Sequence, residues 1–104
     1  MVPNFDLSKV EGFKWDEGNL EHLKKHEVDY TECEEIFSNL PLLLNEGTVH
    51  SKFEERIQVL GRTNNGRLLF IAVTIRNNKI RVISARDQSK QERNQYKKAG
   101  VDGL

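Results

Sequence analysis

The stretch "ERIQVLGRTNNGRLLFIAVTIRNNKIRVISAR", residues 55–86, decides the fold. Its first part alternates Ile57, Val59 and Gly61 with Arg56, Gln58, Leu60 and Arg62, which is the period of a strand. "TNNG" then predicts a turn, residues 67–76 form a nearly continuous apolar run, "NN" predicts a second turn, and residues 79–86 complete the pattern. These segments predict a three-stranded antiparallel meander whose middle strand is buried on both faces.

The last predicted strand runs directly into a helix. Strand alternation over residues 81–86 places Arg81, Ile83 and Ala85 on one side and Val82, Ser84 and Arg86 on the other. Ser89 lies three residues before Glu92, the spacing of a capping box, and Tyr96 follows Glu92 by one helical turn. Because Tyr96 is nearly the only apolar residue of this helix, the helix either lies loosely on the surface, docks through Tyr96 alone, or waits for a partner.

Two further helices are expected in the first half of the chain. Asp16 ends a short strand-like segment, residues 13–16, and is suited to cap a helix through residues 17–26. Thr31 and Glu34 have capping-box spacing before a second helix that ends at Pro41, and residues 42–46 are either a strand or irregular. The first 12 residues are either an arm or a first strand. The sequence therefore predicts one α+β domain, residues 1–104, with helices packed on an antiparallel sheet of three to four strands and a C-terminal helix.

The composition limits the class of protein. Hydrophobic residues make up 37% and charged residues 31% of the chain, as expected for a folded domain with a charged surface. No apolar run approaches the roughly 20 residues of a membrane helix, and the N-terminus lacks the pattern of a secretory signal, so we expect a cytoplasmic protein. Cys33, the single cysteine, lies at a position expected to face the core of its helix.

Charge is divided between the two halves of the chain. Residues 1–55 carry five basic and thirteen acidic residues, a net charge of −8, whereas residues 56–104 carry eleven basic and three acidic residues, a net charge of +8. A clustered basic half is what contacts with a polyanion require. Mutual neutralisation of the two halves on folding is the alternative explanation.

Arginines are the strongest candidates for a binding site. Arg56 and Arg62 share one face of the first strand of the meander, and Arg86 ends the third strand. Side chains on one face of neighbouring strands can converge on a phosphate, which a guanidinium binds with two N–H groups. Each of these arginines taken singly is also compatible with a solvated position on the sheet.

Proton-transfer candidates are fewer. Glu92 either completes a capping box or acts beside the arginines, and Tyr96 is either a docking residue or a functional one. His26 is expected at a helix C-terminus, where it is either a cap or a general base. The i, i+4 spacing of His22 and His26 is possible for zinc, but no third ligand is evident, so we expect no metal. There is no phosphate-binding glycine loop, and we expect no cofactor.

Several segments together resemble the BrnT family of type II toxins. The residues that carry the resemblance are "FKWDEGNLEHLKKHEV", "ECEEIF", "EERIQVLGR", "GRLLFIAVT" and "RVISARDQSKQERNQY", which run collinearly from about Phe13 to Lys98. The resemblance implies a RelE-like fold and a metal-independent endoribonuclease that cleaves RNA by attack of the ribose 2′-hydroxyl and so inhibits translation. It also implies a hetero-oligomer with a ribbon-helix-helix antitoxin.

The family's pattern falls on particular residues of this chain. It implies catalytic roles for Arg62, Arg86, Glu92, Tyr96 and His26, and it also covers Trp15 and Asp16, which we interpret as a core anchor and a helix cap. We expect further RNA contacts from Arg56, Arg81, Arg93 and Lys97. Glu27 stands where the family often has a glycine able to adopt a left-handed helix end. The alternative function is a non-catalytic module of the same fold that binds an antitoxin-like protein or nucleic acid.

Overall fold

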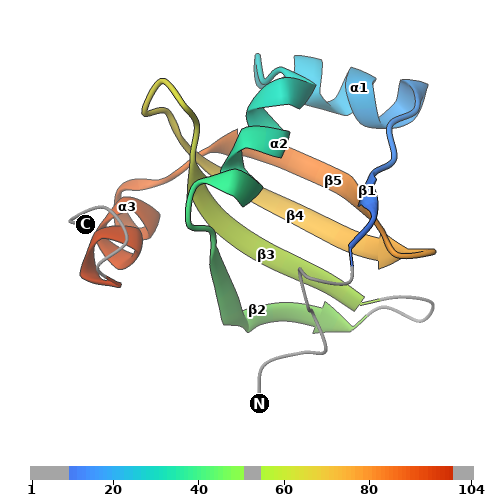
Figure 1. The fold of residues 1–104 in the computed structure, drawn as a ribbon. Helices are drawn as coiled ribbons and strands as arrows, with labels where there is room; N and C mark the ends of the chain where they lie inside the picture. The colour runs from blue at the N-terminus through green and yellow to red at the C-terminus, as the bar shows by residue number, and fades with distance from the viewer. Residues whose placement is uncertain (1–9, 51–54, 100–104) are drawn as a thin grey trace.

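The computed structural model describes residues 10–50 and 55–99, with the side chains of residues 45–50 and 55 left out of the description. The described part is an α+β fold in which three helices accompany a five-stranded sheet (Figure 1). Along the chain, the elements are β1 (Gly12–Phe13), α1 (Glu17–Lys24), α2 (Tyr30–Ser38), β2 (Leu42–His50), β3 (Glu55–Arg62), β4 (Leu68–Arg76), β5 (Lys79–Asp87) and α3 (Lys90–Lys98).

The predicted meander forms the centre of the sheet. The strand order is β1-β5-β4-β3-β2, and β4 is the central strand, as its continuous apolar sequence predicted. Asn77 and Asn78 join β4 to β5 in a two-residue turn, both with positive φ (54° and 64°), the conformation that such hairpins favour.

The sheet differs from the expected antiparallel sheet of three to four strands. Residues 42–50 form a fourth antiparallel strand, and β1 adds a fifth strand that pairs with β5 in parallel. Backbone hydrogen bonds from Glu11 to Asn78 (2.7 Å) and from Lys14 to Ile80 (2.9 Å) hold this segment along the open edge of β5. Of the first 12 residues, 1–9 lie outside the described part, so their expected role as an arm or a strand is tested only at Gly12.

A β-bulge changes the predicted alternation of β5. Ser84 pairs with Ala72 but Val82 pairs with Val73, so Ile83 has no partner residue on β4. Val82 and Ala85 consequently both join the core beneath the helices, and the prediction that they face opposite sides was wrong. Arg86 still shares a face with Ser84, on the side of the sheet opposite α1 and α2.

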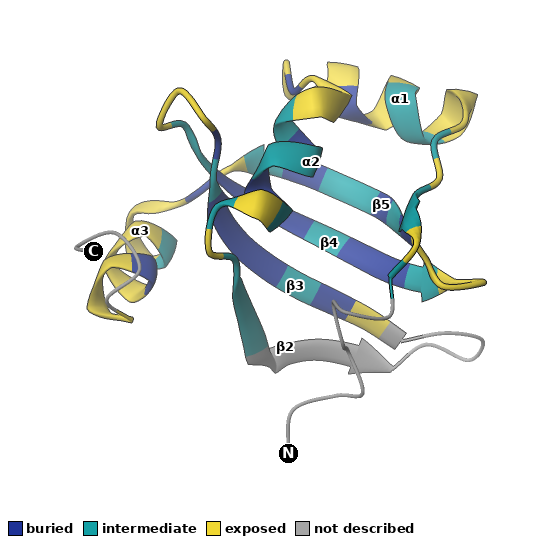
Figure 2. Ribbon diagram, viewed as in Figure 1, coloured by how far each residue is buried: buried dark blue, intermediate teal, exposed yellow. Residues whose placement is uncertain are grey.

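The two faces of the sheet are covered unequally. Helices α1 and α2 pack on one face, over a large core that includes Leu23, Cys33, Ile36, Val59 and Ile71 (Figure 2). The other face carries a small cluster of Leu60, Phe70 and Tyr96, with Leu42 and Leu44 packed against it. Within residues 10–50 and 55–99, one face of the sheet therefore packs against the main core, and the other is covered only where α3 docks.

Helix α2 starts earlier than predicted. Asp29 is its N-cap, and Asp29 and Glu32 form the capping box in place of Thr31 and Glu34. The Asp29 carboxylate accepts hydrogen bonds from both the backbone and the hydroxyl of Thr31, which commits Thr31 to the first turn. Leu40, expected to continue the helix, lies beyond its end at Ser38 and is half exposed.

Glycine allows α2 to lie directly on β3. A Cβ placed on Gly61 would overlap the side chain of Ile36, which is fully buried. Gly61 faces the helix, so the next residue, Arg62, faces the opposite side of the sheet. The close contact between Gly61 and Ile36 thus fixes the direction of Arg62, a residue of the candidate site, on the other face.

Candidate functional site

The guanidinium of Arg86, on the α3 side of the sheet, is held in place by contacts with three residues. It lies 4.1 Å above the centroid of the Phe70 ring, the residue opposite Arg86 on β4. Its Nη1 and Nη2 atoms donate to the two carboxylate oxygens of Glu92, at 2.8 and 2.9 Å, and Nη1 also donates to the carbonyl of Asp87 at 3.1 Å. Ring stacking and a bidentate ion pair together hold the guanidinium in one orientation.

The local sequence explains how Glu92 reaches Arg86. Ser89 caps α3, and the Glu92 carboxylate accepts from the backbone N–H of Ser89 at 2.8 Å, so the predicted capping box is confirmed. Only Gln88 and Ser89 separate β5 from α3. The side-chain amide of Gln88, which is buried, donates to the carbonyls of Gly61 on β3 and Leu69 on β4. These two hydrogen bonds fix the direction in which α3 leaves the sheet.

Both members of the pair are ionised at neutral pH. The hydrogen bond to Arg86 lowers the pKa of Glu92, with help from the Ser89 N–H and against the effect of burial. The same bond raises the pKa of Arg86. A carboxylate with a lowered pKa and both oxygens bound is a poor proton acceptor, so the geometry suits Glu92 to holding Arg86 in place.

Arg86 keeps one edge of its guanidinium open. A guanidinium has five N–H donors, and three of those in Arg86 are engaged by Glu92 and Asp87. Among the described residues, no acceptor bonds to its Nε–H or to the second N–H of Nη2. These two donors form one side of the planar fork, which is the arrangement that binds two oxygens of a phosphate.

Arg62 lies on the same face as Arg86, across β4. Arg62 pairs with Leu68 and Arg86 with Phe70, so the two arginines flank β4 on opposite sides and are offset by two residues along it. Arg62 is half-buried, and its carbonyl accepts from the side chain of Asn39 at 3.0 Å.

Tyr96 is the residue through which α3 docks. It is fully buried in the cluster with Leu60 and Phe70, and its hydroxyl donates to the carbonyls of Leu40 (3.3 Å) and Asn39 (3.5 Å). Of the three possibilities for this helix, docking through Tyr96 is the one observed.

Two of the predicted RNA-binding arginines lie elsewhere on the sheet. Arg56 is at the start of β3, six residues from Arg62 and therefore about 20 Å away. Arg81 is near the start of β5 and pairs with Asp16, the N-cap of α1, at 3.2 Å. The structure does not bring Arg56 or Arg81 together with Arg62 and Arg86.

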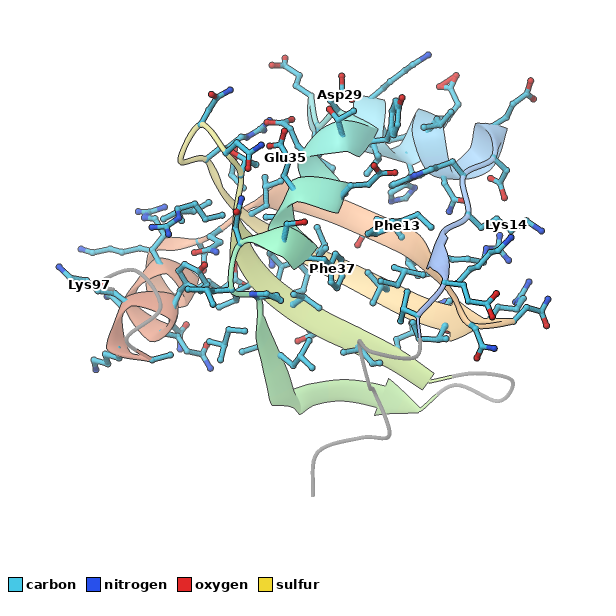
Figure 3. The ribbon with its side chains drawn as sticks, viewed as in Figure 1. Phe13, Lys14, Asp29, Glu35, Phe37 and Lys97 are labelled. Carbon is cyan, nitrogen blue, oxygen red and sulfur yellow. The ribbon has the colours of Figure 1, made fainter. Side chains whose placement is uncertain are left out.

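Helix α3 presents the remaining basic candidates. Arg93 and Lys97 are exposed, and Lys97 points away from the body of the molecule (Figure 3). Arg93 donates to the carbonyl of Gln88 at 3.0 Å, which leaves most of its N–H groups toward solvent.

His26 belongs to a second charged group, on the face of the sheet that α1 and α2 cover. We call this the helix-covered face. It is exposed in the turn between α1 and α2, and its carbonyl accepts from Nη2 of Arg67. Arg67 also pairs with Asp87 (2.8 Å) and Glu32 (3.1 Å) and donates to the carbonyl of Glu27. Sequence reasoning missed Arg67, because its partners lie 20 to 41 residues away along the chain.

The turn that carries His26 has a left-handed residue. Glu27 has φ = 55°, so the position at which the resembled family often has glycine adopts the conformation that glycine favours. Arg67 holds this turn by donating to the carbonyls of two consecutive residues, His26 and Glu27.

Trp15 and Asp16 have structural contacts. Trp15 stacks on Phe13, meets Tyr30 edge-on and donates from Nε1 to Glu34 at 2.9 Å, which ties β1 to α2. Phe13 also contacts Phe37 edge-on between the sheet and α2 (Figure 3). Asp16 caps α1 as predicted.

A groove adjoins the Arg86–Glu92 pair. Its volume is about 610 Å³, and it opens between β2, β3 and α3. Leu42, Leu44 and Gln58 line it from the sheet, and Gln91, Glu92 and Gln95 line it from the helix. Glu92 therefore lies between the groove and Arg86.

Metal-ligating residues do not gather in the part of the chain that the structure describes: no three His, Cys, Asp or Glu side chains there are placed to hold an ion. No helix within residues 10–50 or 55–99 combines the length and apolar character that a membrane crossing requires.

Comparison with known families decides the class of this protein. The family model described as "Ribonuclease toxin, BrnT, of type II toxin-antitoxin system" matches residues 15–92, which include Arg62, Arg86 and Glu92. The chain belongs to the BrnT family. A BrnT protein is a ribonuclease toxin, so membership indicates RNA as the target and an antitoxin as the partner. A search of curated proteins gave no match to the chain.

Proposed function

We propose that this BrnT chain is a metal-independent endoribonuclease with a RelE-like fold, and that Arg86 is its principal phosphate-binding residue. The observation that carries the proposal is the guanidinium of Arg86: Glu92 binds its two terminal nitrogens, and no acceptor among the described residues bonds to the two N–H donors of its side edge. Arg62, on the same face across β4, supplies the second positive charge.

The reaction we propose needs no group beyond the RNA and the protein. The ribose 2′-oxygen attacks the adjacent phosphorus, the bond to the 5′-oxygen breaks, and the products carry a 2′,3′-cyclic phosphate and a 5′-hydroxyl. The 2′-proton leaves to a base, and the 5′-oxygen takes up a proton. Negative charge grows on the phosphate oxygens in the transition state, where preorganised donors such as Arg86 lower the barrier most.

Roles for the other candidates follow from their surroundings. Glu92 positions Arg86, because its pKa is lowered and its oxygens are bound. Tyr96 docks α3, because its hydroxyl is buried against two carbonyls. His26 remains the proposed general base, with an exposed imidazole at the same end of the sheet, and Arg93 and Lys97 are proposed to contact the RNA backbone.

The partner we propose is a ribbon-helix-helix antitoxin that forms a hetero-oligomer with the toxin in the cytoplasm. An acidic segment of the antitoxin would compete with RNA for the open edge of Arg86 and for Arg62. Electrostatic competition predicts that antitoxin affinity falls with salt, and that Arg62→Ala and Arg86→Ala reduce this salt dependence. Equal affinity of both variants and the native toxin at every salt concentration would exclude this picture.

Induced expression in bacteria and cleavage of total RNA by purified protein test the main proposal. We expect growth arrest and cleavage with the native chain, and loss of both with Arg86→Ala and Arg62→Ala. Arg76→Ala, an exposed arginine at the opposite end of β4, is the matched control and should remain active. Cleavage should persist in excess EDTA, and the fragments should end in cyclic phosphates; cleavage that EDTA abolishes would refute the mechanism.

One observation supports the alternative of a non-catalytic binding module. Tyr96 is buried, Glu92 is bound to Arg86, and His26 lies in the turn on the helix-covered side, so none of the three has a free proton-accepting atom beside Arg86. Normal growth and intact RNA with the native protein, together with antitoxin binding, would establish this alternative.

A further inference from the structure

The side-chain amide of Gln58 lines the groove beside the candidate site. Gln58 on β3 stands opposite Leu44 of β2 and Ala72 of β4, on a face where its neighbours are apolar. Its side chain is half-buried and lines the groove. An amide at a half-buried position among apolar side chains can present its donors and its acceptor to a ligand in the groove.

The walls of the groove match a flat, polar-edged ligand. Leu42 and Leu44 provide an apolar surface beside Gln58. On the opposite wall, Gln91 and Gln95 lie four residues apart and so share one face of α3. A nucleobase has an apolar face and an edge with adjacent donors and acceptors, and an amide offers one donor and one acceptor side by side.

The position of the groove indicates where on the RNA such a base would be. Glu92 lines the groove and binds Arg86, so a base in the groove would belong to a nucleotide next to the phosphate on Arg86. Single-stranded RNA presents unstacked bases that proteins read in this way.

We propose that this groove is a nucleobase subsite, and that Gln58 reads the edge of a base adjacent to the cleaved phosphate. The inference rests on the proposed function for its ligand, RNA, but not on cleavage. It assigns to Gln58 a role in sequence preference, with Gln91 and Gln95 as secondary contacts on the helix wall.

Binding of uncleavable RNA tests the subsite independently of catalysis. We would use RNA hexamers with 2′-deoxyribose at the central linkage, vary each flanking base in turn, and measure affinity by fluorescence anisotropy. The native protein should prefer one base at one flanking position, and Gln58→Leu should reduce that discrimination by about 5- to 100-fold. Gln58→Glu, which replaces the donor with an acceptor, should change which base is preferred.

Controls separate recognition from folding. Asn94→Leu removes an exposed amide of α3 that does not line the groove, and it should leave the base preference unchanged. Gln58→Leu should leave the melting temperature equal or higher, because it places an apolar side chain among apolar neighbours. In addition, the side-chain amide signal of Gln58 in NMR spectra should shift when the preferred hexamer is added.

Three outcomes would overturn the subsite. The first is tight binding of hexamers with equal affinity for every base, and the second is an unchanged preference in Gln58→Leu. The third is a Gln58 signal that responds to the antitoxin but not to RNA, which would assign the groove to the protein partner. Failure of the ribonuclease proposal gives a different result, since hexamers would still bind with base preference while natural RNA remained intact.

Discussion

Two arginines at one end of the sheet have opposite surroundings. Arg67, on the helix-covered face, uses four of its five N–H donors on Asp87, Glu32 and the carbonyls of His26 and Glu27. Arg86, on the α3 face, uses three on described residues, and no acceptor in that part of the chain bonds to the other two. The side chain of Arg67 is 28% exposed and that of Arg86 is 41% exposed.

The difference separates a structural arginine from a ligand-binding one. Arg67 fastens the α1–α2 turn to the end of β5, and its donors are consumed by the protein. Arg86 is held as firmly, by Phe70 and Glu92, but the contacts hold it with two donors left over. Preorganisation with free donors is what transition-state binding needs, because no reorganisation is then required during the reaction.

Replacing Arg86 should have the largest effect on activity. We expect Arg86→Ala to lower the rate of RNA cleavage by about 10²- to 10³-fold, the usual effect of removing one preorganised donor to a developing oxyanion. The free energy of unfolding of Arg86→Ala should change by much less than the activation free energy of cleavage. Single-turnover cleavage and urea unfolding of the same preparation measure both quantities. Arg86→Lys should not restore the rate, since an ammonium lacks the two-donor edge.

The helix-covered face should show the largest effect on stability. Gly61→Ala forces a methyl group into Ile36 and should reduce the free energy of unfolding by about 1–3 kcal/mol, the usual cost of overpacking. Gly18→Ala is the matched control: Gly18 lies in α1 with only the Asp16 carboxylate near, so alanine should be neutral or stabilising there. Equal stability of both variants in urea unfolding would contradict the close contact.

Arg67→Ala should give the reverse of the Arg86 result. Loss of its hydrogen bonds to Asp87 and Glu32 should reduce the free energy of unfolding by about 1–2 kcal/mol, a value lowered because the pair is partly exposed. Cleavage per folded molecule should change less than in Arg86→Ala. An Arg67→Ala protein that is as stable as the native chain but does not cleave RNA would refute the division of roles between the two arginines.

Acid should weaken the Arg86–Glu92 pair. The pKa of Glu92 is lowered in the folded state, so the pair stabilises the protein above the ordinary glutamate pKa of about 4.3, and this contribution is lost as the pH falls further. We expect the free energy of unfolding of the native chain to decrease below about pH 4.3 more steeply than that of Glu92→Gln. Asp87→Asn is the corresponding variant for Arg67, because Arg67 lowers the pKa of Asp87. Parallel pH profiles of the native chain and Glu92→Gln would mean that the pair does not stabilise the fold.

The smallest expected change is a gain in stability in the turn that Arg67 holds. Glu27→Gly relieves a left-handed residue and should raise the free energy of unfolding by about 0.5–1 kcal/mol. Glu21→Gly, at an exposed position inside α1, is a useful control and should destabilise by about 1 kcal/mol. A destabilised Glu27→Gly variant would show that the Glu27 side chain contributes more than its backbone costs.

Local patterns predicted much of the fold. The meander, its central strand and the Ser89–Glu92 capping box depend on neighbouring residues or on strand periodicity, and all three are present. The start of α2 was misplaced because two capping pairs, Asp29–Glu32 and Thr31–Glu34, lie two residues apart, and the spacing rule does not rank them. The bulge at Ile83 has no local signature, so the alternation in β5 was predicted without it.

The candidate site was predictable only in part, because its geometry depends on pairing between distant strands. The choice of Arg62 and Arg86 followed from their place on the meander. The distance of about 20 Å between Arg56 and Arg62 follows from six residues of one strand and could have been derived from the sequence. The pairing of Arg81 with Asp16 required the position of α1. The roles of Arg67 and Gln58 were not apparent, since an arginine or glutamine in or beside a strand is ordinary until its neighbours are known.

The attachment of α3 has a consequence for motion. This helix has one buried side chain, Tyr96, with Glu92 and the Gln88 linker at its start, whereas α2 buries both Cys33 and Ile36. Segments held by few apolar contacts open at lower free energy than the whole domain unfolds, and their amide hydrogens exchange sooner. Because Glu92 is carried on α3, each opening would release Arg86 from its fixed orientation and remove one wall of the groove. We therefore expect local opening of α3 to disable the site at a temperature below the melting of the sheet.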